Sequence, residues 1–211
     1  MDRTTCTFKT VFGTIAAEKA PGPSATFSIL HVILALQAID EESLGRIKLA
    51  ERIGLGEGAV RTIIGRLRDE DLIKVSKEGC SLTEKGKCLW KEYRCIFRKS
   101  IMIGMNKLTN SPHTAAILVR AVPLHVGSGI AQRDAAVRAG ATSAVTMTFA
   151  KGKLRIPSVS DDLSKDFPEI SRELIRLLQP KENDVIIVGS GDNSRAAEYG
   201  TLAAALTLCG S

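Results

Sequence analysis

The segment Leu49–Ile73, "LAERIGLGEGAVRTIIGRLRDEDLI", most strongly limits what this chain can fold into. Its closely spaced glycines have the pattern of a phosphate-binding loop, but such a loop must follow a β-strand. The residues before the glycines instead place Ile47, Ala50 and Ile53 on one side at helical spacing. We therefore predict a helix, a short turn that starts with Gly54, and a second helix.

The second predicted helix has one apolar face and one basic face. Val60, Ile63, Ile64 and Leu67 recur at about 100° per residue and form the apolar face. The opposite face carries Arg61, Thr62, Gly65, Arg66 and Arg68. Long cations around a small central residue are typical of a helix that enters the major groove of DNA. A basic helix face that only meets solvent is the alternative.

The residues that follow complete a recognisable order of elements. Residues 72–75 and 80–82 predict two short strands with Lys77 at the tip of the loop between them. Thr83 suits the N-cap of a helix that runs to about Arg98, and residues 27–39 predict an earlier helix with Ile29, Val32, Ile33, Leu36 and Ile39 as its buried stripe. This order predicts a winged helix, in which Arg61, Thr62, Gly65 and Arg66 contact the bases and Arg68, Lys74 and Lys77 contact phosphates.

The motifs "GLGEGAVRT" at 54–62 and "LTEKGK" at 82–87 resemble those of winged-helix transcriptional regulators. Together with "RDAAVRAGATSAVTM" at 133–147, they resemble an uncharacterised archaeal family in which a winged helix is joined to a conserved domain of unknown function. The resemblance extends from Phe27 to the C-terminus. It implies a winged helix-turn-helix fold and DNA binding, and it implies no particular chemistry for the C-terminal domain.

The chain is predicted to contain a flexible N-terminal arm (1–26), a winged helix (27–99) and a second domain (100–211). Buried-type strands at 114–122, 141–150 and 184–189 alternate with helices at 129–140, 162–179 and 193–208. This order predicts a compact α+β domain, a two-layer α/β sandwich whose sheet has one helical face and one open face. We expect the second domain to sense a ligand or to dimerise the protein.

The second domain contains a glycine-rich turn between a predicted strand and a predicted helix. Backbone N–H groups at the start of that helix could hold an anion near Gly189, Gly191, Asp192, Asn193 and Ser194. The alternative is purely structural, with glycines for the tight turn and Asp192 or Asn193 as the helix cap. Dinucleotide binding is excluded because no strand follows to supply the acid for the ribose. Arg133 and Asp134, at the predicted start of another helix, are a second weak candidate site.

Composition limits the function classes further. Residues 1–110 contain 18 basic and 13 acidic side chains, a net charge of +5, whereas residues 111–211 contain 11 and 10, a net charge of +1. The excess in the first half can attract a polyanion. The five cysteines form no C-x-x-C pair, and Cys88 and Cys95 are expected to be buried, so no metal site is predicted. No cofactor, catalytic motif or membrane span is recognised, which predicts a cytoplasmic protein that is not an enzyme.

The leading hypothesis is a transcriptional regulator that binds double-stranded DNA as a homodimer and responds to a small-molecule effector. Its dimer interface is expected on the C-terminal helix, which is rich in small residues, or on the helix at 83–98. Two alternatives stay open. One is a nucleotide- or phosphate-binding protein or enzyme with a fused regulatory winged helix, and the other is a winged helix that contacts a protein.

Overall fold

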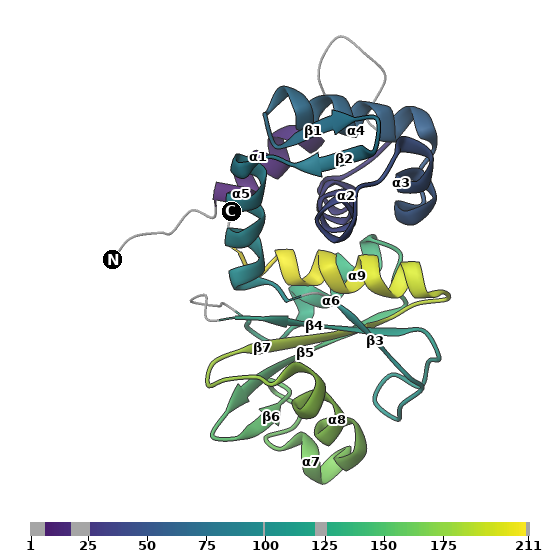
Figure 1. Ribbon diagram of the computed structural model, residues 1–211. Helices are drawn as coiled ribbons and strands as arrows, with labels where there is room; N and C mark the ends of the chain where they lie inside the picture. The colour runs from purple at the N-terminus through teal and green to yellow at the C-terminus, as the bar shows by residue number, and fades with distance from the viewer. Residues whose placement is uncertain (1–6, 18–25, 99, 121–125, 210–211) are drawn as a thin grey trace. The chain divides into compact units, whose positions relative to one another are not determined.

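The computed structural model describes residues 7–17, 26–98, 100–120 and 126–209. The chain divides into two compact units, with the boundary after Tyr93, inside a helix. The first unit contains α1 (Thr7–Ala16), α2 (Ile29–Glu41), α3 (Arg46–Ile53), α4 (Glu57–Asp69), β1 (Ile73–Ser76), β2 (Gly79–Leu82) and most of α5 (Glu84–Ile96) (Figure 1).

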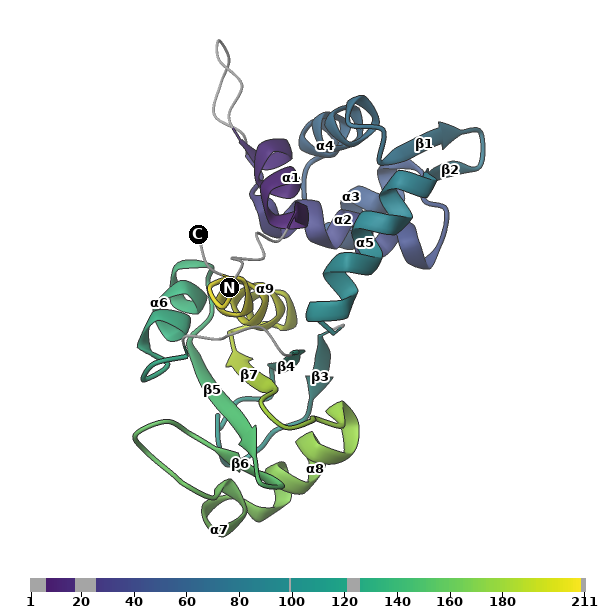
Figure 2. The ribbon, with the colours of Figure 1, turned by 90° about the vertical axis from the view of Figure 1, so that its left-hand side faces the viewer.

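Helix α1 lies within the segment that the sequence analysis assigned to a flexible arm. Phe8 and Phe12 are fully buried, and α1 packs against α2 and α4 (Figure 2). The Phe8 ring meets the edge of the Tyr93 ring, with 5.4 Å between centroids. The prediction of an arm is therefore wrong for Thr7–Ala16. Phe8, Phe12 and Ile15 form an apolar stripe at helical spacing, and all three are buried. The free energy gained by burying them outweighs the low helix propensity of the threonines and the glycine between them.

Helix α2 was predicted, but it is buried on more sides than its predicted stripe. Leu30, Leu34 and Ala35 are buried in addition to the stripe, whereas Ile29 is only half-buried. The cause is that α2 contacts α1, α3 and β2. At its start the Ser28 N–H donates to His31 Nδ1 at 3.0 Å. Burial lowers the pKa of His31, which favours the neutral ring that can accept this bond.

Helices α3 and α4 flank the turn that the sequence analysis predicted. Gly54 adopts a left-handed conformation (φ 68°) at the end of α3, and its N–H donates to the Ala50 carbonyl. Leu49, Ala50 and Ile53 form the buried side of α3. Ile47 was predicted on that side but is 58% exposed. The prediction for Ile47 rested only on its spacing from Ala50 and Ile53. Ile47 lies in the first turn of a short helix, and the buried part of that helix begins at Leu49.

The predicted hairpin is present and has a two-residue turn, since Ser76 pairs with Gly79. A further segment joins the hairpin, because Leu44, which precedes α3, forms an antiparallel bridge with Cys80 of β2. Their bond runs from the Cys80 N–H to the Leu44 carbonyl at 2.9 Å. A Cβ at Gly79 would lie 2.7 Å from the Leu44 carbonyl carbon, so only glycine fits here.

Helix α5 begins where it was predicted, with the Gly86 N–H donating to the Thr83 hydroxyl at 3.0 Å. Trp90 and Tyr93 are buried, and their rings stack with centroids 4.7 Å apart. Cys88 and Cys95 were expected to be buried, but both are exposed. They lie on the face of α5 opposite Trp90 and Tyr93, so their seven-residue spacing marks the solvent side of the helix rather than the core side.

The second unit is built on a five-stranded sheet with the order β3-β4-β7-β5-β6, in which all neighbours are antiparallel. At one edge of the sheet β3 pairs with β4, with Ile101 opposite Ala116. The elements are β3 (Ile101–Ile103), β4 (Thr114–Val119), α6 (Ile130–Arg138), β5 (Ser143–Ala150), β6 (Lys153–Arg155), α7 (Leu163–Asp166), α8 (Pro168–Leu178), β7 (Val185–Ser190) and α9 (Ser194–Leu206).

The mixed α+β character was predicted correctly, but the two-layer arrangement was not. Helices α6 and α9 cover one face of the sheet and α7 and α8 the other, as Figures 1 and 2 show. On the second face Leu174 and Leu178 of α8 pack with Ala116, Leu118 and Ile186. The predicted open face, with its room for a ligand, is therefore occupied. Strands β4 and β7 are apolar on both sides, which is the pattern of a sheet buried between two layers.

The helix predicted over 162–179 is two helices, with the break at Phe167 and Pro168. Pro168 occupies the first turn of α8, where its missing N–H is not needed. Asp162 caps α7 by accepting from the Ser164 N–H. The pKa of Asp162 is lowered to about 2 by hydrogen bonds from Lys153 and Ser164. Leu177, which lies between the buried Leu174 and Leu178, is 41% exposed.

The small residues of α9 are used inside the second unit. A Cβ at Gly200 would lie 2.3 Å from Ala141 Cβ, which follows α6. Thr201 is fully buried, and its hydroxyl donates to the Ala197 carbonyl at 2.7 Å. Gly200 and Thr201 are therefore not available to pair two copies, and a dimer interface on α9 stays a prediction. Among the described residues, no helix is long and apolar enough to cross a membrane.

Candidate nucleic-acid interface

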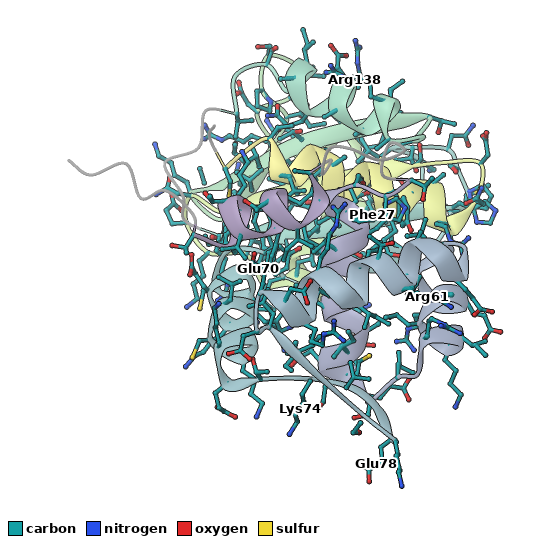
Figure 3. All side chains as sticks on the ribbon, turned by 90° about the horizontal axis from the view of Figure 1, so that it is seen from above. Phe27, Arg61, Glu70, Lys74, Glu78 and Arg138 are labelled. Carbon is teal, nitrogen blue, oxygen red and sulfur yellow. The ribbon has the colours of Figure 1, made fainter. Side chains whose placement is uncertain are left out.

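Helix α4 presents one continuous exposed face. Val60, Ile63 and Leu67 are buried behind it, as predicted, whereas Ile64, predicted with them, is only half-buried. Arg61, on the exposed side, is labelled in Figure 3. We call the residues that share this side at helical spacing the α4 face: Gly58, Arg61, Thr62, Gly65 and Arg68. It therefore combines two exposed guanidinium groups with small residues between them.

Two glycines leave the centre of the α4 face without projecting side chains. At both Gly58 and Gly65, an added Cβ would meet no atom within 4 Å. Between them the Thr62 hydroxyl donates to the Gly58 carbonyl at 3.1 Å, so this side chain folds back against the helix. A flat polyanion or a base edge could thus approach the α4 backbone closely. Gly58 was not singled out from the sequence, although its seven-residue spacing from Gly65 is a signal that could have found it.

Arg66 was predicted to read a base, but the structure gives its side chain an internal role. Its Nη1 donates to the Ile15 carbonyl at 2.7 Å and to the Ala17 carbonyl at 2.6 Å. The guanidinium also lies over the Phe27 ring, 5.2 Å from its centroid. Helix α1 has no basic residue in its last turn, so Arg66 supplies the cation that favours a helix C-terminus. Base contact by Arg66 would require these bonds to break.

The hairpin carries the other predicted phosphate contacts. Lys74 is exposed on β1 and Lys77 is exposed in the turn beside Glu78 (Figure 3). Lys74 also lines a shallow depression of about 290 Å³, together with Asp40, Glu42 and Lys87. The acids in this depression make its charge mixed. Of the two lysines, Lys77 is therefore better placed for a polyanion. On α4 one exposed acid, Asp69, lies at the C-terminal end of the α4 face, four positions after Gly65.

The remaining predicted cation on α4 has an acidic neighbour. Arg68 Nη2 lies 3.3 Å from Asp69 Oδ1, and both side chains are more than half exposed. An exposed pair of this kind contributes little to stability and breaks easily when a stronger anion arrives. At the other end of the helix, Arg46 of α3 pairs with Glu57 at 3.3 Å. This pair leaves Arg61 as the cation of the α4 face without a charged partner among the described residues.

In the second unit, the candidate turn at 189–194 is explained by packing. Gly189 lies within β7, and a Cβ there would be 2.4 Å from the Thr201 hydroxyl. At Gly191 it would be 2.7 Å from the Ala197 nitrogen. Asn193 caps α9 by accepting from the Ala196 N–H at 3.0 Å. Asp192 and Ser194 are exposed, and the Ser194 hydroxyl lies 3.3 Å from His113 Nδ1. These contacts supply the structural explanation that the sequence analysis kept open.

The second weak candidate, Arg133 with Asp134, is not at a helix start. Helix α6 begins at Ile130, and the Arg133 N–H already donates to the Gly129 carbonyl at 3.0 Å. Asp134 was predicted in the first turn of this helix, next to the positive end of the helix dipole. It instead lies in the second turn, so that prediction is wrong. The two side chains pair with each other at 3.3 Å. Within the described residues, no hydrogen bond or ion pair joins them to Asp192, Asn193 or Ser194.

These features define a mixed α+β protein with a helical N-terminal unit and a C-terminal antiparallel sheet. A family model described as "PH0730-like, N-terminal domain" matches residues 29–88, and one described as "Domain of unknown function (DUF4443)" matches residues 111–208. Among solved structures, the chain is similar to "Hypothetical protein PH0730 from Pyrococcus horikoshii OT3", with 26% sequence identity and a TM-score of 0.71 over 86% of this chain and 92% of that chain. No curated protein matches the chain. These matches support the resemblance to an archaeal family with a C-terminal domain of unknown function.

The open space at Gly65 leads to a prediction on stability. Because the glycine lies inside α4 and nothing would touch its Cβ, Gly65→Ala is expected to raise the free energy of unfolding by about 0.5–1 kcal/mol. Urea denaturation followed by the fluorescence of Trp90, the single tryptophan, measures this change. A loss of stability would mean that another group covers Gly65.

Proposed function

We propose that the protein is a DNA-binding regulator that inserts α4 into the major groove. The α4 face carries this proposal, because it combines exposed arginines with glycines that leave the helix backbone open. A helix that reads base edges needs cations with reach and a surface that can come close to the DNA. The proposed activity is binding rather than catalysis.

The order of elements in the first unit supports a winged helix. Helices α2, α3 and α4 precede the hairpin, and α3 and α4 are joined by a three-residue turn as in a helix-turn-helix. The bridge from Leu44 to Cys80 adds a third strand segment to the hairpin. In this arrangement α4 is the recognition helix and the β1–β2 hairpin is the wing.

The proposed contacts divide between bases and phosphates. Arg61 and Thr62 would meet base edges in the groove, where the absence of side chains at Gly58 and Gly65 lets α4 approach. Arg68 at the end of α4 and Lys77 on the wing would contact phosphates, with Lys74 as a weaker contributor. Phosphate contacts fix the orientation of a protein on the duplex, and base contacts supply the specificity.

The proposal predicts that Arg61→Ala weakens binding to a preferred duplex by about 1–3 kcal/mol, or roughly 5- to 150-fold. The preferred sequence would first be selected from random duplex DNA, and affinities would then be measured at several salt concentrations. Arg176→Ala removes an exposed arginine from α8 in the other unit, so it serves as the matched control and should bind as the unchanged protein does.

Two outcomes would contradict the proposal. If the protein bound no duplex even at low salt, the α4 face would not be a nucleic-acid interface. If Arg61→Ala and Arg176→Ala weakened binding equally, affinity would come from net charge rather than from α4. A selected motif with two half-sites about one helical turn apart would support the homodimer that we propose.

Arg66→Ala needs a different interpretation from Arg61→Ala. Since its contacts hold α1, we propose that Arg66 supports the recognition helix from the side rather than reading a base. A loss of stability without a change in sequence preference would agree with that role. A change in sequence preference would instead return Arg66 to the base-reading set.

A further inference from the structure

The sequence Val-Gly-Ser-Gly occurs twice, at 126–129 and at 188–191, and each copy is followed by a helix. The second copy, before α9, is closed by Asn193 and by the close packing of its glycines. The first copy, before α6, is different. Gly127 and Gly129 both have a positive φ, of 55° and 82°, and α6 has no side-chain cap.

The first turn of α6 leaves its amide groups open. The first helical bond is donated by Arg133 to the Gly129 carbonyl. The N–H groups of Ile130, Ala131 and Gln132 precede it, and they have no acceptor among the described residues. Ile130 and Ala131 are exposed. Three such donors at a helix N-terminus favour an anion through both hydrogen bonding and the helix dipole.

Two buried polar atoms without partners accompany this turn. Thr146 of β5 is 4% exposed, and its hydroxyl has no hydrogen-bond partner among the described residues. A Cβ at Gly129 would lie 3.7 Å from that hydroxyl and 3.4 Å from Thr146 Cβ, so the hydroxyl lies directly beneath the turn. Gln132 is 2% exposed. Its Nε2 donates to the Thr207 hydroxyl at 2.9 Å, whereas its Oε1 has no partner within the part of the chain that the structure describes.

Buried polar atoms without partners are rare because each costs free energy. Around the turn at 127–132 the donors without an acceptor are the N–H groups of residues 130–132 and the Thr146 hydroxyl. The acceptor without a donor is the side-chain carbonyl of Gln132. An oxyanion that also carries a hydroxyl matches both sets. A phosphate group does so at neutral pH, since its second pKa is about 6 and part of the population keeps a P–OH.

We propose that the turn at 127–132 binds the phosphate group of a small phosphorylated metabolite. The amides of the first α6 turn and the Thr146 hydroxyl would donate to the phosphate oxygens. Gly127 and Gly129 allow the close approach, because a side chain at 129 would cover Thr146. Arg133 follows on α6 with its guanidinium 3.3 Å from Asp134, and a bound phosphate would compete with that carboxylate for it. This site needs no DNA, so it stands or falls independently of the α4 face.

The test is titration of the full chain with inorganic phosphate, followed by calorimetry and by amide chemical shifts, with ionic strength held constant by chloride. We expect saturable binding with shifts centred on Ile130–Gln132 and weaker binding of acetate, which has no hydroxyl at neutral pH. Thr146→Val keeps the volume of the side chain and removes the hydroxyl. It should weaken phosphate binding about tenfold while raising the melting temperature of the free protein, since an unpartnered hydroxyl is lost.

Asn193→Ala removes the cap of α9 and is the matched control, and its phosphate affinity should not change. Gln132→Met is a second variant that keeps the side-chain length, and it should also weaken binding. The proposal is overturned if the unchanged protein shows no saturable binding. It is equally overturned if Thr146→Val and Gln132→Met bind phosphate as the unchanged protein does, or if the shifts centre on α9 instead of α6.

Discussion

Replacing Phe12 with alanine is expected to lower the free energy of unfolding of the first unit by about 3–5 kcal/mol. Phe12 is fully buried, and its ring lies 5.8 Å from that of Phe8 and 6.3 Å from that of Tyr93. Removal of the ring leaves a cavity in an aromatic cluster that joins α1 to α5. Urea denaturation monitored through Trp90 fluorescence reports the change, because Trp90 stacks on Tyr93 in the same cluster.

Thr10→Ala is the control for Phe12→Ala, since Thr10 is exposed on the same helix. Its effect should stay within about 0.5 kcal/mol. If Phe12→Ala cost less than 1 kcal/mol, α1 would not be docked in solution. The role of Arg66 as the cation at the end of α1 would then fail with it, and Arg66 would be free to contact DNA.

Gly86→Ala is expected to destabilise the first unit by about 3 kcal/mol, at the upper end of the cost of overpacking. A Cβ at this position would lie 2.0 Å from the Leu72 carbonyl oxygen. That oxygen cannot move away easily, because it also accepts from the Thr83 N–H at 3.0 Å. The substitution therefore has to shift the start of α5 or the end of the α4–β1 connection.

Gly65→Ala is the matched control for Gly86→Ala. Both glycines lie inside helices, so both lose the same flexibility of the unfolded chain when alanine is introduced. Only Gly86 has a backbone oxygen in the way. Denaturation midpoints measured through Trp90 should thus move in opposite directions for the two variants. A stabilised Gly86→Ala protein would show that α5 does not approach Leu72 so closely.

The sequence predicted well those elements whose periodicity is strong and local. The buried side of α4, the hairpin and the Thr83 cap follow from spacing and from the chemistry of single residues. Ile47 was misplaced because helical periodicity identifies an apolar stripe but does not show where along the helix the core begins. Cys88 and Cys95 were misplaced because a repeat of seven marks either face of a helix equally well.

The candidate sites were harder to predict because they depend on partners distant in sequence. Arg66 lies at the right spacing to read DNA, and only the docking of α1, about 50 positions earlier, shows where its side chain goes. The glycines at 189 and 191 look like those of an anion-binding turn until α9 is packed on β7. Thr146 gives no signal in the sequence, since an ordinary strand threonine becomes notable only when its buried hydroxyl has no partner.

The glycines of α4 have a consequence for how the proposed recognition helix responds to temperature. Each glycine in the helix interior costs about 1 kcal/mol of helix propensity relative to alanine. A short segment with such low helix propensity would not stay helical by itself. The helix is therefore stabilised by the burial of Val60, Ile63 and Leu67 and by the hydrogen bonds that Arg66 donates to the end of α1. We therefore expect α4 to be the first part of the first unit to fray on warming. The proposed affinity for DNA would then fall before the unit unfolds, and it would fall earlier in any variant that loosens α1.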